Sequence, residues 1–243
     1  MGLLKILKET GNYLKTRARL RLLLVIPCIV VFLLLFLSAF QWSPLYVDIG
    51  DWGVPRTVFM VVSLLIGGHW WREYTSYKKG FEGESMVTKL LKLGLPDDFY
   101  LINDVKIKDK TGKVRNIDHV VLSPRGIFVI ETKNWKGKIT AHHDQWSTTW
   151  GNPSIQAQKN ALFIKNVIDS LEHFKNLRIW VEPIVVFTNS DIDLDVWDMA
   201  VKVAKLNELL SCLLNFEGNT NYLSDFSTEE LDLIGEEILR QTL

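Results

Sequence analysis

An uncharged apolar run close to the N-terminus constrains the fold more than any other feature. Residues 22–40 read LLLVIPCIVVFLLLFLSAF, without a charged side chain. A helix of about 20 residues is about 30 Å long, which is the thickness of the hydrocarbon core of a bilayer. Pro27 lies near the start of the run, where a helix tolerates proline best. The run predicts a membrane-spanning helix.

A second apolar run follows at about residues 54–71 (VPRTVFMVVSLLIGGHWW). Arg56 and the pair Gly67 and Gly68 dilute it, although an arginine near one end can extend its charge to the membrane interface. We therefore expect a two-helix transmembrane hairpin at residues 22–71, with the lipid bilayer as its partner. Aromatic residues lie at the ends of the runs, as in an interfacial belt: Trp42, Tyr46, Trp52, Trp70 and Trp71.

A cleaved signal peptide and a buried helical hairpin are the alternatives to this interpretation. The basic segment at residues 1–21 is long for a signal peptide, and a second apolar run follows closely. An uncharged run as long as the first is rare in a small soluble domain. Both alternatives therefore fit the pattern less well than two membrane spans.

The distribution of lysine and arginine predicts the orientation. Basic residues precede the first run, and Arg72, Lys78 and Lys79 follow the second, whereas residues 41–53 contain neither lysine nor arginine. The positive-inside rule then places both termini in the cytoplasm, beneath the plasma or inner membrane. Residues 1–71 carry a net charge of +4 and the remainder −4, which excludes a uniformly basic nucleic-acid binder.

The two cysteines carry no site of their own in this interpretation. Cys28 lies in the first apolar run and Cys212 in an expected helix. Neither spacing suggests a disulfide framework or a zinc site, and both fit a reducing compartment.

The remaining chain, residues 78–243, has the patterns of a mixed α/β domain that follows a short polar linker. Apolar periodicity predicts a sheet flanked by helices, of the α/β or α+β class. The expected helices are 83–93, 152 to about 174, about 206–214 and 227–241, and the expected strands are 99–107, 117–122, 127–133, 138–140, 179–187 and 201–204. Polar turns are expected at 109–113 and 123–126.

Three charged residues lie on the expected strands 117–122 and 127–133. Glu131 and Lys133 are two residues apart, so both side chains point to the same face. The turn between the strands places Asp118 nearly opposite Glu131. Burying such charges unpaired is costly. Either Glu131 and Lys133 form a structural ion pair, or a divalent cation lies between the two carboxylates with Lys133 beside it.

The second alternative has a defined chemistry. Mg²⁺ takes a few carboxylate oxygens and keeps several waters. It would activate a water and neutralise the charge that grows on a phosphate. Lys133 would orient that water or stabilise the transition state. The residues alone leave the ion pair and the cation site both open.

Four separated segments resemble the nuclease-related domain (NERD) family. They are GFEGES (80–85), NIDHVVLSPRGIFVIETKNWKGKI (116–139), Trp146 and NPSIQAQKNA (152–161), and the resemblance covers about residues 78–175. It implies a restriction-endonuclease-like fold of the PD-(D/E)XK class, with Asp118 at the D position and Glu131-Thr132-Lys133 at the (D/E)XK position. Ile117 stands where that pattern has proline.

The resemblance implies further site residues. Glu84 matches the glutamate of the family's first helix, and Gln156 matches a glutamine on the helix after the core. Asp118, Glu131, the backbone carbonyl of Thr132 and Glu84 become the expected ligands of Mg²⁺ or Mn²⁺. Without the resemblance, Glu84 fits a solvated helix residue and Gln156 a surface amide.

Other side chains near the site are expected to be structural. His119 alternates away from Asp118 and should lie on the other face of the sheet. His142 and His143 are adjacent, so they cannot share a face of a strand, and we expect them in a surface loop. Trp135 could stack on a base, but a core position or the rim is the simpler expectation.

The charge balance of the domain suits a polyanionic substrate. Residues 78–138 carry a net charge of +5 and residues 139–243 carry −9, which ordinary solubility could also explain. The sequence as a whole predicts a membrane-anchored, Mg²⁺-dependent nuclease acting on cytosolic DNA or RNA. The alternatives are a non-catalytic nucleic-acid-binding or sensing module and a membrane scaffold that keeps the fold.

Overall fold

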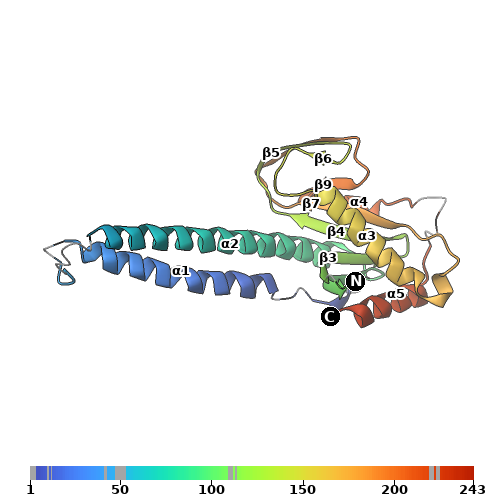
Figure 1. Cartoon of the computed structure of the whole chain (residues 1–243). Coiled ribbons are helices and arrows are strands. Elements are labelled where there is room, and N and C mark those ends of the chain that lie inside the picture. The colour runs from blue at the N-terminus through green and yellow to red at the C-terminus, as the bar shows by residue number, and fades with distance from the viewer. Residues whose placement is uncertain are drawn as a thin grey trace. The chain divides into compact units, whose positions relative to one another are not determined.

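The chain divides into two compact units in a computed structural model (Figure 1). One unit is Asn12–Phe81, and the other combines Met1–Gly11 with Glu82–Leu243. The structure describes residues 4–9, 11, 13–40, 43–46, 53–108, 112, 114–218, 222 and 225–243.

Two helices lying side by side make up the first unit. α1 is Tyr13–Leu37, and α2 is Gly53–Gly94, whose residues 53–81 belong to this unit. Arg21 Nε lies 2.6 Å from Glu73 Oε2, and a Cβ on Gly67 would lie 3.2 Å from Cys28 Cβ. Within the described residues, α1 is the one helix that is long and apolar enough to cross a membrane.

Both helices of this unit expose large apolar side chains. On α1, Leu23 is 61% exposed, and on α2, Phe59 is 60% and Leu65 is 69% exposed. Packing within the unit therefore covers only part of its apolar surface. The predicted loop at 41–53, with Trp42 and Trp52, lies mostly outside the described residues.

The polar linker expected before a helix at 83–93 is wrong. α2 continues without a break from Gly53 to Gly94. Residues 72–82 (REYTSYKKGFE) contain no proline, and the single Gly80 is a modest penalty in a long helix. The helix ends at Gly94, as predicted, with Pro96 two residues beyond.

A six-stranded mixed sheet forms the centre of the second unit, in the order β1-β2-β3-β4-β7-β9. β2, β3 and β4 form the antiparallel meander that the sequence predicts, and the other neighbours are parallel. The strands are β1 (Lys5–Lys8), β2 (Tyr100–Lys108), β3 (Val114–Ser123), β4 (Gly126–Lys133), β7 (Val181–Phe187) and β9 (Lys202–Lys205). The expected turn at 109–113 lies almost wholly outside the described residues.

The helices after the meander begin at the predicted caps. The Asn152 side chain accepts a hydrogen bond from the Ile155 N–H at the start of α3 (Pro153–Asp169), and Ser227 forms a capping box with Glu230 before α5 (Thr228–Gln241). α3 ends earlier than expected, and a 3₁₀ turn η2 (Glu172–Phe174) follows. Residues 206–214 divide into a 3₁₀ turn η3 (Leu206–Glu208) and α4 (Leu209–Leu214).

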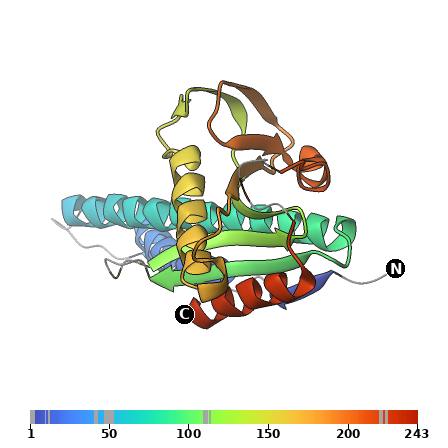
Figure 2. The same ribbon diagram turned by 90° about the vertical axis from the view of Figure 1, so that its right-hand side faces the viewer.

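Helices cover both faces of the six-stranded sheet. α3 and α5 pack on one face through side chains such as Ile164 and Ile234, while the last turns of α2 and α4 pack on the other through Leu91 and Leu213 (Figure 2). All four of these side chains are fully buried. The mixed α/β architecture that the sequence predicts is confirmed, and the sheet lies between two layers of helices.

A second sheet was not predicted. It has the order β6-β5-β8, from β5 (Gly137–His142), β6 (Gln145–Trp146) and β8 (Ile192–Trp197). We predict from the sequence the start of β5 but not its partner β8, although the apolar residues of IDLDVW alternate with aspartates as in a half-buried strand. β5 and β8 are parallel, with Gly137 opposite Ile192 and His142 opposite Trp197.

Candidate functional site

The meander brings Asp118 and Glu131 together as the turn spacing predicts. β3 and β4 are antiparallel with His119 opposite Ile130, so the next positions along the ladder are Asp118 and Glu131. The Thr132 backbone N–H donates a 2.8 Å hydrogen bond to Asp118 Oδ2. The two carboxylates therefore lie side by side where β4 ends.

The Lys133 side chain bridges β4 and α3 through hydrogen bonds. Its Nζ donates to Glu131 Oε1 at 2.6 Å and to Gln156 Oε1 at 3.1 Å. Asn160 Nδ2 donates to Glu131 Oε2 at 3.3 Å. Gln156, which the family resemblance implies as a site residue, therefore contacts Lys133 in the structure. Asn160 also reaches the site, because a residue four positions later lies on the same face of a helix. That spacing is the signal from which Asn160 could have been predicted.

Burial makes this carboxylate pair difficult to ionise fully. Asp118 is 8% and Glu131 2% exposed. Burial and the nearby Asp118 raise the pKa of Glu131 to about 8, against the opposing influence of Lys133. Burial raises the pKa of Asp118 to about 6, although the Thr132 N–H and Lys133 favour its charged form. The pair favours either a shared proton or a cation near neutral pH.

Two more carboxylates act on this pair. Burial, followed by the charges of Asp118, Asp104 and Glu131, raises the pKa of Glu84 to about 9. Glu84 therefore lies within electrostatic reach of the site, where the resemblance expects it. We did not predict Asp104 as a site residue from the sequence, because it lies within the alternating pattern of β2. Asp104 has a left-handed φ of +49°, and its Oδ2 is 3.3 Å from Lys106 Nζ.

The donor set fits a hard divalent cation. Asp118, Glu131 and Glu84 supply carboxylate oxygens, which Mg²⁺ and Mn²⁺ prefer. A cation would also favour the ionised forms that burial opposes. Thr132 pairs with Val186 in the ladder between β4 and β7, and metal ligation by its backbone carbonyl stays a prediction.

The predictions are confirmed for His119 and His143 but not for His142, which lies on a strand. His119 is buried on the opposite face, where its Nδ1 lies 2.7 Å from Asn103 Oδ1, and burial lowers its pKa to about 3. We expected both His142 and His143 in a surface loop, and this is confirmed for His143, which lies in the turn after β5. His142 ends β5, and His143 leaves the strand with φ +46°, so that both rings approach Asp198.

Trp135 lies beside Lys133 and packs against two further tryptophans. The Trp135 ring centroid is 5.9 Å from Lys133 Nζ and 5.3 Å from the ring of Trp150. Trp135 also packs against Phe187 and Trp146, which confirms the expected core or rim position. The sequence alone did not single out Trp150, which is 62% exposed.

Comparison with known proteins identifies the segment that holds these residues. Residues 79–188 match the family model of the nuclease-related domain. An uncharacterized protein of Bacillus anthracis is 38% identical over 61 residues, which is 25% of this chain and 29% of that protein. The probable kinase PglW of Streptomyces coelicolor is 27% identical over 135 residues, which is 51% of this chain and 8% of that protein.

The chain thus spans less than a third of the length of either of these curated relatives. No solved structure matches it significantly.

Proposed function

We propose that the nuclease-related domain at residues 79–188 hydrolyses phosphodiester bonds of cytosolic DNA or of RNA. One observation carries the proposal. Asp118 and Glu131 are buried next to each other, and Lys133 contacts both Glu131 and Gln156. Such a charge arrangement is costly in a sheet core without a chemical task.

Each residue has a separate task in this proposal. Asp118, Glu131, the Thr132 carbonyl and Glu84 would hold Mg²⁺ or Mn²⁺, which supplies an activated water and neutralises phosphate charge. Lys133 donates to Glu131 and Gln156, and its third ammonium hydrogen is left for a substrate phosphate oxygen or the attacking water. Gln156 positions Lys133. The attacking water forms a bond to phosphorus and gives up a proton to solvent, the bond from phosphorus to the leaving oxygen breaks, and that oxygen takes a proton from solvent.

The order of elements supports assigning the domain to the restriction-endonuclease-like PD-(D/E)XK class. An antiparallel meander β2-β3-β4 is followed by α3 and then by β7, which is parallel to β4. Asp118 lies on β3, while Glu131 and Lys133 lie at the end of β4. These are the positions that the family resemblance requires of the three residues. The proposed domain covers residues 78–243.

We further propose that residues 22–71 anchor the domain in the membrane through two spans. α1 supports the first span, and the exposed apolar side chains near the start of α2 support the second. Arg21 pairs with Glu73 and lies over the Trp70 ring at 4.6 Å, a combination suited to the membrane interface. The lysine and arginine distribution supports an orientation with both termini in the cytoplasm.

Two alternatives differ from a nuclease in what they require of the site. A binding or sensing module would bind nucleic acid without cleaving it, and a membrane scaffold would need neither metal nor nucleic acid. Thermal unfolding of the full chain in detergent separates the scaffold from the other two. Mn²⁺ or Mg²⁺ should raise the melting temperature of the wild type, and Asp118→Ala should remove that shift. A Mg²⁺-induced shift that survives Asp118→Ala would contradict the proposed cation site.

A further inference from the structure

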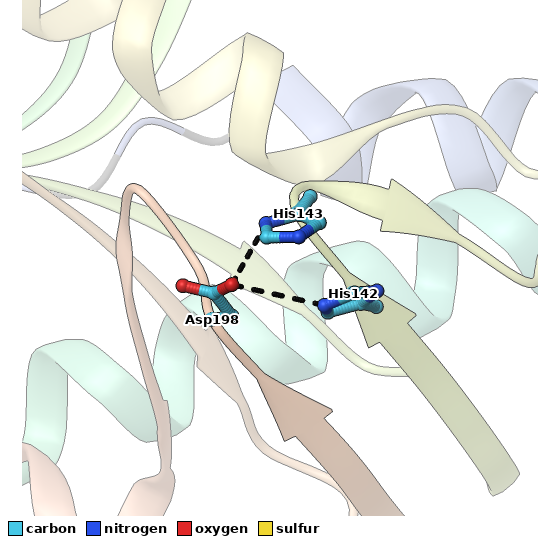
Figure 3. Close-up of side chains that lie close together, drawn as sticks. All are labelled: His142, His143 and Asp198. Atoms are coloured by element: carbon cyan, nitrogen blue, oxygen red, sulfur yellow. Dashed lines mark ion pairs between the residues drawn. The ribbon is translucent and has the colours of Figure 1, made fainter.

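Three side chains converge at one end of the second sheet (β6-β5-β8), and the nuclease proposal assigns none of them a role. Figure 3 shows His142, His143 and Asp198 directed toward one another. Asp198 Oδ2 is 2.9 Å from His143 Nδ1 and 3.7 Å from His142 Nε2, and the three ligating atoms lie within 4.8 Å of one another.

The convergence depends on strand register and on unusual backbone conformations. β5 and β8 are parallel, with His142 opposite Trp197, so Asp198 follows β8 at the same end of the sheet. φ is +46° at His143 and +55° at Asp198. These left-handed conformations turn each side chain back from the alternation of its strand.

The ion pairs alone do not account for this geometry. The three side chains are 38%, 63% and 65% exposed for His142, His143 and Asp198, and exposed ion pairs contribute little. Within the described part of the chain, four non-glycine residues have positive φ, and three of them, His143, Asp144 and Asp198, lie in these two turns. The two-residue hairpin between His142 and Gln145 accounts for two of them, since its turn requires positive φ at His143 and Asp144. Asp198 has no such turn, and its conformation is of the kind that carries a cost and concentrates where a ligand requires it.

We propose that His142, His143 and Asp198 bind a transition-metal ion of the zinc class. Two imidazole nitrogens and one carboxylate oxygen are ligands that Zn²⁺ accepts, and a water or a substrate atom would complete a tetrahedral site. Imidazole distinguishes this set from the all-oxygen set around Asp118 and Glu131, which suits Mg²⁺. The proposal does not depend on nuclease activity.

Neighbouring side chains contact His142 and the turn that follows it. The Trp197 ring stacks on His142 and holds its orientation. In the same turn, the Asp144 backbone carbonyl accepts from Asn152 Nδ2 at 2.7 Å, and Gln158 Nε2 donates to Asp144 Oδ2 at 3.4 Å. Asn152 caps α3.

The ion would therefore fix the end of β8 to the β5–β6 turn and, through Asp144, to the start of α3. That is the helix turn from which Gln156 reaches Lys133. Metal binding at these turns should stabilise the native chain, because the unfolded chain lacks the assembled ligands.

The test is Zn²⁺ titration calorimetry on the full chain in detergent, in an Asp118→Asn/Glu131→Gln background that disables the oxygen site. We expect about one Zn²⁺ per chain. Adding His143→Asn should weaken Zn²⁺ binding roughly tenfold or more. Asparagine suits this position because it tolerates positive φ better than alanine. Asp198→Asn is the second variant and should have the same effect.

His173→Asn is the matched control. His173 is also partly exposed and also pairs with a carboxylate, since its Nε2 lies 2.8 Å from Glu230 Oε1. Its removal should leave Zn²⁺ affinity unchanged. Absence of Zn²⁺ binding in the background, or unchanged affinity after both His143→Asn and Asp198→Asn, would overturn the proposal.

A spectroscopic measurement on the otherwise unmodified chain makes the test independent of that background. Co²⁺ bound to imidazole in a four- or five-coordinate site absorbs visible light more strongly than Co²⁺ in an all-oxygen octahedral site. We expect this absorption in the wild type and its loss in His143→Asn, with retention in His173→Asn. Equal spectra in the wild type and His143→Asn would contradict the assignment.

Discussion

Replacing Glu131 by glutamine separates the catalytic interpretation of this residue from a structural one. The carboxylate is 2% exposed, its Oε1 is 2.6 Å from Lys133 Nζ, and its Oε2 accepts from Asn160 at 3.3 Å. Glutamine has nearly the same shape and keeps one acceptor oxygen for Lys133. We expect Glu131→Gln to abolish cleavage and to leave the fold as stable as the wild type, or more so, near pH 8.

The magnitude follows from the raised pKa of Glu131. Burial and Asp118 raise this pKa from 4.5 to about 8, so the folded state holds the proton more tightly than the unfolded state. The resulting stability is fully present below about pH 4.5 and is lost as the pH rises through about 8. One such proton changes the free energy of unfolding by at most about 1.4 kcal/mol per pH unit. For a domain of this size, that corresponds to roughly 3–5 °C of melting temperature per unit.

The assay is thermal unfolding of the full chain in detergent and a chelator, between about pH 5 and pH 8. The melting temperature of the wild type should fall as the pH rises. That of Glu131→Gln should fall less steeply, because the titrating group is gone. Glu172→Gln is the control, since Glu172 is 84% exposed and its substitution should leave the slope unchanged.

The outcome that would refute this reasoning is a strong destabilisation of Glu131→Gln at pH values near 8. It would mean that Glu131 serves mainly as the structural partner of Lys133, because removing one member of a buried pair costs on the order of 3–5 kcal/mol. Equal slopes for the wild type and the variant would also contradict the raised pKa of Glu131.

Three further predictions concern Lys133, Trp150 and the membrane topology. Lys133→Met should lower cleavage roughly a hundredfold, with Mn²⁺ affinity and melting temperature retained; undiminished cleavage would exclude a catalytic lysine. Trp150→Ala should weaken binding of single-stranded DNA by about 1–3 kcal/mol in a fluorescence titration, whereas Trp180→Ala, whose 40% exposed ring packs near Tyr222, should not. A cysteine at Leu45 should react with a membrane-impermeant maleimide added outside intact cells; protection there together with reaction from the cytosolic side would refute the predicted topology.

Local patterns predict the centre of the second unit well. Alternation predicts β2 and apolar runs predict β3 and β4, and the four-residue turn between β3 and β4 fixes the register that brings Asp118 opposite Glu131. The starts of α3 and α5 follow from Asn152 and Ser227, whose side chains satisfy backbone donors within the same few residues. These features depend on interactions between residues that are close in sequence.

Features that depend on distant parts of the chain could not be predicted in this way. β1 (KILK) becomes a strand only because its backbone pairs with the edge of β2, almost a hundred residues later. β8 likewise depends on β5 for its pairing. Asp104 and the convergence of His143 with Asp198 depend on positive φ, which the residue types permit without requiring it.

The central proposal is tested most directly by cleavage of labelled nucleic acid by the full chain in detergent. Single-stranded, duplex and branched DNA and single-stranded RNA are incubated with Mg²⁺ or Mn²⁺ or with a chelator, using the wild type and Asp118→Asn. Asparagine keeps an acceptor for the Thr132 N–H, so the hairpin geometry should persist. We predict metal-dependent cleavage by the wild type and its loss in Asp118→Asn. Absence of cleavage by folded, metal-bound wild type on every substrate, or equal cleavage by Asp118→Asn, would contradict a nuclease at this site.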